Sequence, residues 1–480
     1  TTFQVAHRIR AILRPGSAQE VQACVRVANQ TKIPLYPVSG GRNWGMGSRA
    51  PSADGCVLLD LSRLNRIVEF DEKFAYMTVE PGVTFRQAYE YLCDRTVRLY
   101  LPGMGGPDAA SLIGNVLERG DGRGPYGDRA LHVCGAEVVL PDGEMIHLGF
   151  ARFPGARVAP LARWGVGPHL DGLFTQSNLG IVTRMSFWLA PVAEHYATFF
   201  TTISSSAALG GFLDAMRPLV LRDIVQPGCL GVWNAYKTLA SEGRYPWTAM
   251  GGKTPLNLTQ LSRRDTDPWF ASGTVLAWSE DHLKSLSDLV QQSFSASDVR
   301  VTLMPADQGA RQDIRSFPLS VPDMQTVRST YWRKKTEVPE NPDPDRDRCG
   351  VMWICPLFPF DGALIASAMP AFETVYRKFD FEPNVGMCPT SGRSMHVYLA
   401  LMYDRDVPGE DERAMACQNE LHQLALQLGC PPYRLGIQSM SVPGGDASYV
   451  RLLRQMKRAL DPNDILAPGR YDWRHEWPDD

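Results

Sequence analysis

The sequence predicts an α+β fold, and three observations support this prediction. The first 190 residues alternate strand-like and helical segments that are separated by short turns containing Gly and Pro. From about residue 197 the pattern changes to longer helical segments between apolar runs. The chain has 480 residues, of which 44% are hydrophobic, so it can form two or three domains with large cores.

The chain is expected to begin with a helix over residues 18–30 and a short strand over 33–37. The apolar positions of this helix that share one face are Val21, Cys24, Val25 and Ala28. The strand leads into the loop PVSGGRNWG at 37–45, which holds three glycines within six residues. Glycine accepts positive φ and lets a ligand approach the backbone N–H groups, so this loop can bind a diphosphate. Its glycine spacing differs from that of the Walker and Rossmann motifs.

Further strands are expected at 56–61 and 74–80, followed by a helix that begins at Thr84. Gln87 stands three residues after Thr84, which is the spacing of a capping box. In the second half of the chain the sequence predicts helices at 281–296, 362–378 and 410–428, a strand at 351–354 and a surface loop at 337–348.

Two more glycine-rich loops lie in the first 190 residues. The segment LPGMGGPD at 101–108 precedes SLIGN at 111–115, and DGLFTQSNLGIVT at 171–183 leads into a strand-like run. A large planar cofactor with a diphosphate needs several close-approach surfaces, one for the phosphates and others along its ring system. Three such loops in one expected domain favour a cofactor of this kind over three ordinary turns.

Composition and charge exclude several classes of protein. Lys and Arg total 49 against 52 for Asp and Glu, so the net charge of −3 and the lack of a basic run argue against nucleic acid as a partner. No run of 18 apolar residues is present, and the first residues, TTFQVAHRIR, lack the apolar core of a signal peptide. We therefore expect no membrane span and a cytoplasmic protein.

Cysteine and histidine give no sign of a metal site. The ten cysteines are scattered without a Cys-x-x-Cys pair, and the nine histidines are equally dispersed. Scattered cysteines of this kind are typical of reduced, buried thiols in the cytosol. Because a His-x-x-x-His helix is also absent from the sequence, we expect no catalytic metal.

Five motifs resemble those of the vanillyl-alcohol oxidase and para-cresol methylhydroxylase type of FAD-linked oxidoreductases. They occur in the family's order: PVSGGRNWGMG at 37–47, VEPGVTF at 79–85, IGNVLERG at 113–120 with PYGD at 125–128, DGLFTQSNLGIVT at 171–183 and DPNDILAPGR at 461–470. The resemblance implies an FAD-binding domain of two subdomains over 1–192, an α+β substrate cap domain over 193–430, and a C-terminal segment, 431–480, that returns to the FAD domain. It also implies a homodimer.

The resemblance places FAD on the three loops and the last motif. The residues it implies for cofactor binding are Pro37, Ser39, Gly40, Gly41, Arg42, Asn43, Trp44, Gly45, Met46, Pro102, Gly103, Ser111, Gly114, Asn115, Gly180, Ile181, Val182 and Arg470. Relatives attach FAD covalently through a His or Tyr before or within the segment that reads CGVMW here, at 349–353, or through a His in the first loop. Residues 333–353 contain neither residue type, and the first loop has Arg42, so we expect non-covalent FAD.

The relatives oxidise para-alkylphenols, which implies hydride removal from a benzylic or allylic carbon of an aromatic, phenolic substrate. Because a free phenol has a pKa of about 10, such a site must stabilise the phenolate. Tyr433 and Arg434 match the family's phenolate-binding pair, in which Arg supplies a permanent charge and Tyr a further donor. His396 matches an active-site histidine that could handle a proton. Without the resemblance, a core Tyr, a surface Arg and a buried His would explain these residues.

Several positions depart from the family pattern. Met46 stands where phenol-oxidising relatives have another phenolate-binding Tyr, and a thioether donates no hydrogen bond. Gly103 follows Pro102 where vanillyl-alcohol oxidase has an Asp near the reactive flavin nitrogen. This loop looks about three residues longer than in the relatives, so Asp108 is expected to re-enter the site from the insertion as a catalytic residue. Met46, Met352 and Trp353 are the expected substrate-binding residues.

Alternatives remain open at this point. The substrate could be a non-phenolic alcohol, amine or hydroxy acid, with Arg434 binding a carboxylate. The chain could also be a flavoprotein that has lost activity and serves as an assembly partner. Pro102 matches a Pro of an oxygen-using relative, which slightly favours an oxidase over a dehydrogenase that passes electrons to an acceptor protein.

Overall fold

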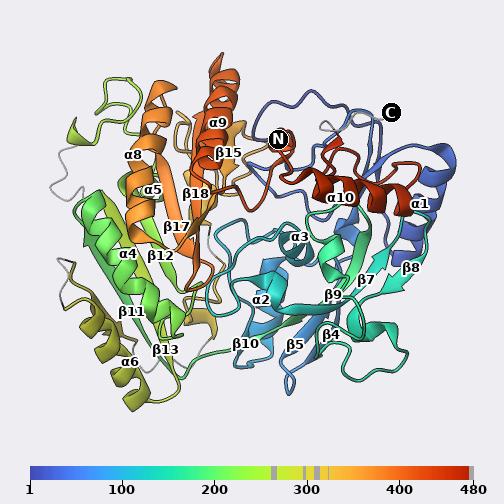
Figure 1. Cartoon of the computed structure of the whole chain (residues 1–480), viewed down its shortest axis with the longest axis horizontal. Coiled ribbons are helices and arrows are strands. Elements are labelled where there is room, and N and C mark those ends of the chain that lie inside the picture. Colours follow the sequence, from blue (N-terminus) through green and yellow to red (C-terminus); the bar gives the residue numbers. More distant parts are fainter. Residues whose placement is uncertain (261–267, 296–298, 307–313, 323, 475–480) are drawn as a thin grey trace.

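The computed structural model describes residues 1–260, 268–295, 299–306, 314–322 and 324–474, and it has the α+β fold that the sequence predicts (Figure 1). Its strands form a three-stranded, a five-stranded and an eight-stranded sheet and a two-stranded pair. The helices are α1 (Ala18–Thr31), α2 (Phe85–Asp94), α3 (Leu112–Leu117), α4 (Ser206–Leu221), α5 (Ala235–Glu242), α6 (Glu280–Ser293), α7 (Gln325–Ser329), α8 (Gly362–Lys378), α9 (Glu410–Gln427) and α10 (Ala447–Leu460).

The two sheets of the N-terminal part differ in strand direction. The three-stranded sheet is parallel and has the order β1 (Ile12–Leu13), β3 (Val57–Asp60), β2 (Leu35–Val38). The five-stranded sheet is antiparallel, in the order β4 (Ile67–Asp71), β5 (Tyr76–Val79), β9 (Ile181–Trp188), β7 (Val133–Val139), β8 (Met145–His147). The first glycine loop follows β2 directly, so a parallel strand end presents it to the centre of the molecule.

The predicted capping box at Thr84 forms only in part. The Thr84 side chain accepts a hydrogen bond from the backbone N–H of Gln87, as expected for the residue that caps α2. The Gln87 side chain does not return the bond, because its amide instead donates to the carbonyl of Asn65 at 2.9 Å. The cap therefore begins the helix, while Gln87 ties it to the segment just before β4.

The eight-stranded antiparallel sheet is built from residues 195–404. Its order is β14 (Thr302–Pro305), β11 (His195–Ile203), β13 (Trp269–Ala277), β12 (Leu230–Asn234), β17 (Asn384–Pro389), β18 (Ser394–Asp404), β15 (Cys349–Ile354), and β16 (Leu357–Pro359) also pairs with β18. Helices α4, α6, α8 and α9 lie on its side away from α2 and α3 (Figure 1). Its other side faces the N-terminal part of the chain.

The small β6 (Leu99–Tyr100) and β10 (Ala190–Pro191) pair with each other at the junction between the two parts of the chain. The C-terminal segment returns to the N-terminal part, as Figure 1 shows for α10 beside α1. The backbone N–H of Leu35 donates to Ile465, and that of Ala467 donates to Leu35, so the last motif pairs with β2. This return places residues 433–434 and the first glycine loop on one side of the molecule.

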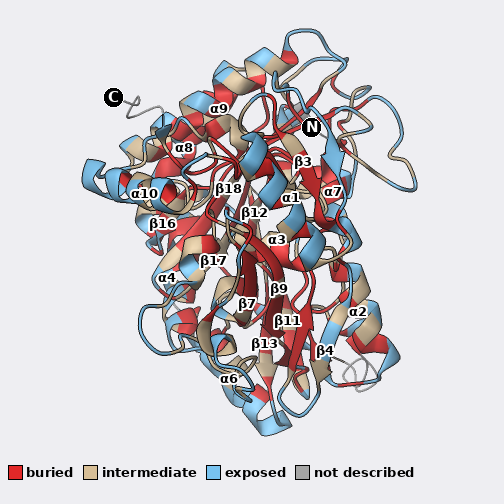
Figure 2. Ribbon diagram, turned by 90° about the vertical axis from the view of Figure 1, so that its right-hand side faces the viewer, coloured by how far each residue is buried: buried red, intermediate tan, exposed pale blue. Residues whose placement is uncertain are grey.

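Burial follows the sheets: strands of both antiparallel sheets are buried along most of their length, and the helices expose one face (Figure 2). All ten cysteines lie in the described residues and are free thiols. Within the described ranges, no helix is long and apolar enough to cross a membrane.

Candidate active site

One cavity of about 850 Å³ lies between the N-terminal part and the eight-stranded sheet. One wall comes from the first two glycine loops, through Arg42–Trp44, Met46 and 104–107, and from Asn115 and 120–123. The opposite wall comes from β11, β12, β13, β15, β17 and β18 and from α5 and α7, and residues 433–434 close one side. Its size is within the range of sites for small molecules and cofactors.

Tyr433 and Arg434 lie side by side in the cavity wall, as the sequence predicts. The backbone N–H of Tyr433 donates to the carbonyl of Cys355 just after β15, which fixes the pair against the sheet. Arg434 donates from Nη2 to the side-chain oxygen of Asn43 at 2.9 Å. Burial raises the pKa of Tyr433 well above its usual value, and the charge of Arg434 acts in the opposite direction. A permanent cation and a hydroxyl donor therefore meet at the first glycine loop.

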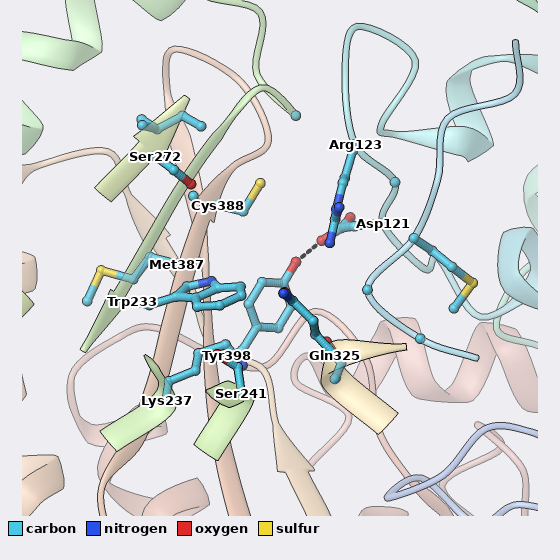
Figure 3. Close-up of a pocket in the computed structure, with 18 of the residues that line it drawn as sticks. Asp121, Arg123, Trp233, Lys237, Ser241, Ser272, Gln325, Met387, Cys388 and Tyr398 are labelled. Atoms are coloured by element: carbon cyan, nitrogen blue, oxygen red, sulfur yellow. Dashed lines mark hydrogen bonds between the residues drawn. The ribbon is translucent and has the colours of Figure 1, made fainter. Parts of the chain in front are cut away.

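Asp121 is the acid of the cavity, and two side chains of β18 hold it. The Nδ1 atom of His396 lies 2.6 Å from Asp121 Oδ2, and the Tyr398 hydroxyl donates to the same oxygen, as the dashed line in Figure 3 marks. His396 and Tyr398 are two residues apart on one strand, so both side chains project from the same face. The carboxylate is 26% exposed, which leaves it open toward the cavity.

His396 lies behind this acid and does not itself line the cavity. Its ring stacks on the ring of Tyr433, with centroids 3.7 Å apart and planes 12° from parallel. It is 7% exposed and contacts Asp121 and Tyr433 at once. The proton-handling role of His396 stays a prediction; the structure shows that His396 contacts Asp121 and Tyr433, and that Asp121 rather than His396 lines the cavity.

Glycine is required in the first loop at Gly45. Its φ is +78°, and a Cβ atom there would lie 2.2 Å from Cδ1 of Trp353. Trp353 in turn lines the cavity, and its backbone N–H donates to the Gly45 carbonyl. The absence of a side chain at Gly45 therefore lets an indole of the eight-stranded sheet pack on the loop. Arg42 fixes the loop from outside through an ion pair of 2.6 Å with Asp343, in the segment expected to be a surface loop.

The second glycine-rich segment is held close to the first loop. A Cβ atom on Gly114 would lie 3.3 Å from Ser39 Oγ, and Ser111 caps α3 by accepting from the N–H of Gly114. Gly103, next to Pro102, donates to Leu319, so the second loop rests on the segment before α7. The remaining expected cofactor residues, Pro37, Gly40, Gly41, Gly180, Ile181, Val182 and Arg470, lie along β2, the start of β9 and the C-terminal motif, outside the cavity wall.

Arg470 links the C-terminal motif to two of these elements. It is 6% exposed and forms an ion pair of 2.6 Å with Glu118, the residue that ends α3. Tyr36 of β2 lies close enough for Arg470 to affect its pKa, which burial raises. The arginine therefore joins α3, β2 and the C-terminal segment.

Two expected site residues lie elsewhere. The Asp108 carboxylate pairs with Arg86 in the first turn of α2 and does not line the cavity, because the backbone carbonyl of Asp108 also binds the Arg86 N–H and turns the residue toward α2. Met352 is fully buried in the hydrophobic core, on the other face of β15 from Trp353, as strand alternation requires. Met46 and Trp353 do line the cavity.

Sequence reasoning missed several polar residues of the cavity wall. The charged ones are Asp121, Arg123, Lys237 and Glu242, and Tyr398, whose hydroxyl binds Asp121, was missed as well. Asp121 directly follows the IGNVLERG motif, and Tyr398 is two residues beyond His396, so a search around both motifs could have found them. Lys237 follows an ordinary strand and has no sequence signal, because only the pairing of β12 with its neighbours aims α5 at the cavity.

Polar atoms of the wall fit a polar cofactor. Trp44 Nε1, Asn115 Oδ1 and Arg434 Nε are buried and have no hydrogen-bond partner among the described residues, although each residue borders the cavity. Buried polar atoms normally have partners. A ligand with several acceptors and donors, beside glycines that allow its close approach, satisfies such a wall, which defines the class as a cofactor-binding protein with a diphosphate-type loop.

The comparisons with known proteins identify that cofactor. Residues 9–149 match the model of an FAD binding domain. The chain is 44% identical to 1'-carboxy-chondrochloren decarboxylase of Chondromyces crocatus, over 99% of this chain and 93% of that protein. It is 30% identical to the flavoprotein subunit of 4-cresol dehydrogenase (hydroxylating) of Pseudomonas putida, over 97% and 88% of the two chains.

Solved structures agree with these relatives. The fold matches p-cresol methylhydroxylase with bound substrate, with a TM-score of 0.86, 28% identity and coverage of 96% of this chain and 88% of that chain. It also matches 4-ethylphenol oxidase of Gulosibacter chungangensis in complex with isoeugenol, with a TM-score of 0.87, 25% identity and coverage of 98% and 91%. The chain belongs to the para-cresol methylhydroxylase type of FAD-dependent oxidoreductases, and it is an enzyme that binds FAD.

Proposed function

We propose that the enzyme removes a hydride from the benzylic carbon of a para-substituted phenol. The observation that carries this proposal is the grouping of Tyr433, Arg434 and Asp121 in one cavity beside the first glycine loop. Bound FAD supplies the two-electron acceptor for the hydride. The protein must therefore stabilise the phenolate that drives the hydride out and manage the phenolic proton.

Tyr433 and Arg434 hold the phenolate oxygen in this scheme. Arg434 is half-buried, is already oriented by Asn43 and has a buried Nε without a partner among the described residues, so its guanidinium is preorganised for an anionic oxygen. Stacking on His396 fixes the tilt of the Tyr433 ring. Departure of a hydride from the benzylic carbon then converts the phenolate to a quinone methide, with no change in the number of protons on the ring oxygen.

Asp121 is the proposed acid–base group of the cavity. Its carboxylate reaches the cavity while His396 and Tyr398 hold one of its oxygens. An oriented carboxylate of this kind can accept the proton of a water that attacks the quinone methide carbon, or the proton of a benzylic alcohol. His396 acts as a positioning residue because it touches Asp121 rather than the cavity.

The proposed cofactor-binding residues are those of the three loops and the C-terminal motif, with FAD held non-covalently. Support comes from the glycine requirement at Gly45, the closeness of Ser39 to Gly114, and the unpaired Trp44 Nε1 and Asn115 Oδ1 in the wall. A protein pellet that stays yellow after acid precipitation would contradict non-covalent binding. A substrate cap over 193–430, a homodimer, a cytoplasmic location, and oxygen or an acceptor protein as the final oxidant remain predictions from the family.

A second candidate reaction is oxidative decarboxylation, which the similarity to a decarboxylase of 44% identity favours. If the carbon next to the benzylic position carries a carboxylate, hydride loss again gives a quinone methide. The bond to the carboxyl carbon then breaks and releases CO₂, and its electron pair forms the side-chain double bond and restores the phenolate. Stoichiometric release of CO₂ per flavin reduced distinguishes this reaction from hydroxylation.

Anaerobic bleaching of the flavin tests the proposed function. The holoenzyme is mixed without oxygen with para-alkylphenols, para-hydroxyphenyl carboxylic acids, non-phenolic benzylic alcohols, amines and hydroxy acids. We expect bleaching by phenols and not by the matching phenol methyl ethers, which cannot form a phenolate. Bleaching by hydroxy acids with none by any phenol would instead support the non-phenolic alternative.

A further inference from the structure

Lys237 is a cation in the cavity that the proposed reaction does not use. It belongs to α5, which begins at Asn234 directly after β12. The neighbouring Tyr236 and Ala240 of α5 are buried in a separate apolar cluster, so Lys237 and Ser241, one turn apart, face the cavity instead. In Figure 3 Lys237 and Trp233 lie together on one side of the cavity, across from Asp121 and Arg123.

The ammonium group of Lys237 has no anionic partner in the part of the chain that the structure describes. Its side chain makes no hydrogen bond or ion pair with any described residue. Its contacts are two indoles, with Nζ 5.3 Å from the ring centre of Trp233 and 5.4 Å from that of Trp353. Protein surrounds the group closely enough for burial to lower the pKa of Lys237 to about 8, although it keeps some surface open to the cavity.

An unpaired buried cation is costly, and two aromatic faces offset only part of that cost. Most enclosed lysines therefore pair with a carboxylate, as Lys334 does here with Asp404 at 2.7 Å. Lys237 departs from that rule in the wall of the cavity. A substrate with an anionic group could supply the missing counter-charge.

The position of Lys237 relative to the phenolate pair also matters. Cys355 lies within electrostatic reach of both Arg434 and Lys237, and its carbonyl fixes Tyr433. The Lys237 ammonium lies over the ring of Trp353, and Trp353 packs against Gly45, the neighbour of Met46. Met46 is the position that lacks the phenol-binding donor of the relatives, so a second cation borders the part of the cavity where a donor is missing.

We propose that Lys237 binds an anionic oxygen of the substrate, as a second oxyanion anchor beside Arg434. This inference rests on the proposed function. It narrows the substrate class to phenols whose anionic oxygen atoms need a second cation in addition to Arg434. Two sources of that oxygen share the chemistry: the phenolate itself, with Lys237 replacing the donor absent at Met46, or a carboxylate on the para side chain.

Ligand binding to the oxidised holoenzyme tests the proposal and distinguishes the sources. The three probes are para-hydroxyphenylpropionate, its methyl ester and its phenol methyl ether, and titration calorimetry gives each Kd. The variants are Lys237→Met, Lys237→Arg and the control Lys335→Met. Lys335 also stacks on an indole, with Nζ 5.2 Å from the ring centre of Trp247, but it is exposed and lies outside the cavity.

We expect Lys237→Met to weaken binding by about 10- to 100-fold for every probe that carries the recognised oxygen, which is the usual effect of losing a charged hydrogen bond. Losses for the acid and the phenol methyl ether, but not the ester, identify a carboxylate. Losses for the acid and the ester, but not the phenol methyl ether, identify the phenolate. Lys237→Arg is expected to retain most of the affinity, and Lys335→Met all of it.

Three results would overturn the proposal. They are unchanged binding of all probes to Lys237→Met, equal losses in Lys335→Met, and the absence of any binding to the unmodified enzyme. A lower flavin content in Lys237→Met with unchanged probe affinity would assign the lysine to FAD and also refute it. The flavin-bleaching experiment tests the proposed function separately. Even if no phenol bleaches the flavin, the Lys237→Met variant can still bind a probe more weakly than the unmodified enzyme does.

Discussion

Replacement of Arg434 by Ala removes the permanent charge that the proposed reaction requires at the phenolate. The guanidinium donates to Asn43 at 2.9 Å, and its buried Nε has no partner among the described residues, so at least one charged hydrogen bond to the substrate is available. A hydrogen bond of this kind contributes about 1.5–3 kcal/mol. At about 1.4 kcal/mol per tenfold change, flavin reduction by a phenol should slow by roughly 10- to 150-fold.

Anaerobic stopped-flow absorbance of the flavin measures this rate directly. Arg434→Lys is the matched variant, since it keeps the charge but loses the planar fork, and we expect an intermediate rate. The thermal midpoint and the flavin content of both variants establish that the site is intact, because Arg434 also orients Asn43 in the first loop. A reduction rate of Arg434→Ala within about threefold of the unmodified enzyme, well below the expected loss, would refute the assigned role.

Further predictions concern other parts of the site and the fold. Asp121→Asn keeps the bond to His396 but removes the base. It should lower turnover by about 10²- to 10⁴-fold with a smaller effect on substrate affinity, measured as kcat against KM. Turnover equal to that of the unmodified enzyme would exclude Asp121 as the base. Gly45→Ala places a methyl group against Trp353 at positive φ, so we expect the free energy of unfolding to fall by about 1–3 kcal/mol. The thermal midpoint should be lower, and an unchanged midpoint would contradict the packing argument. Burial lowers the pKa of His422 to about 4, so the unfolded chain takes up its proton from about pH 6.5 downward while the folded chain does not until about pH 4. Stability should therefore fall by up to about 3 kcal/mol between these pH values, and His422→Phe should lose less of its thermal midpoint from pH 7 to pH 5 than the unmodified enzyme does.

The local signals of the sequence predicted much of the fold. Helices at 18–30, 362–378 and 410–428 and the strand at 351–354 are present within a few residues, because amphipathic spacing and caps are local properties. Tyr433 and Arg434, which a motif predicted as site residues, do line the cavity. Asp108 does not, because the sequence gave no hint that Arg86 would bind its carboxylate. Met352 was misassigned because alternation along a strand shows that neighbours face opposite sides but not which side holds the cavity.

Long-range pairing determined the rest. Asp121 and His396 are 275 positions apart, and Lys237 reaches Trp353 only because β12 and β15 belong to one sheet through β17 and β18. Neither contact has a signature in a single sequence. The sequence did not reveal the residues whose role depends on contacts with distant parts of the chain.

The origin of the transferred hydride tests the central claim most directly. The phenol that bleaches the flavin fastest is prepared with deuterium at the benzylic carbon, and a second sample carries deuterium elsewhere on the side chain. If the hydride leaves from the benzylic carbon next to a phenolate held by Tyr433 and Arg434, only the benzylic label slows anaerobic flavin reduction several-fold. Equal rates for both labelled samples and the unlabelled phenol, with chemistry shown to limit the rate, would contradict the account.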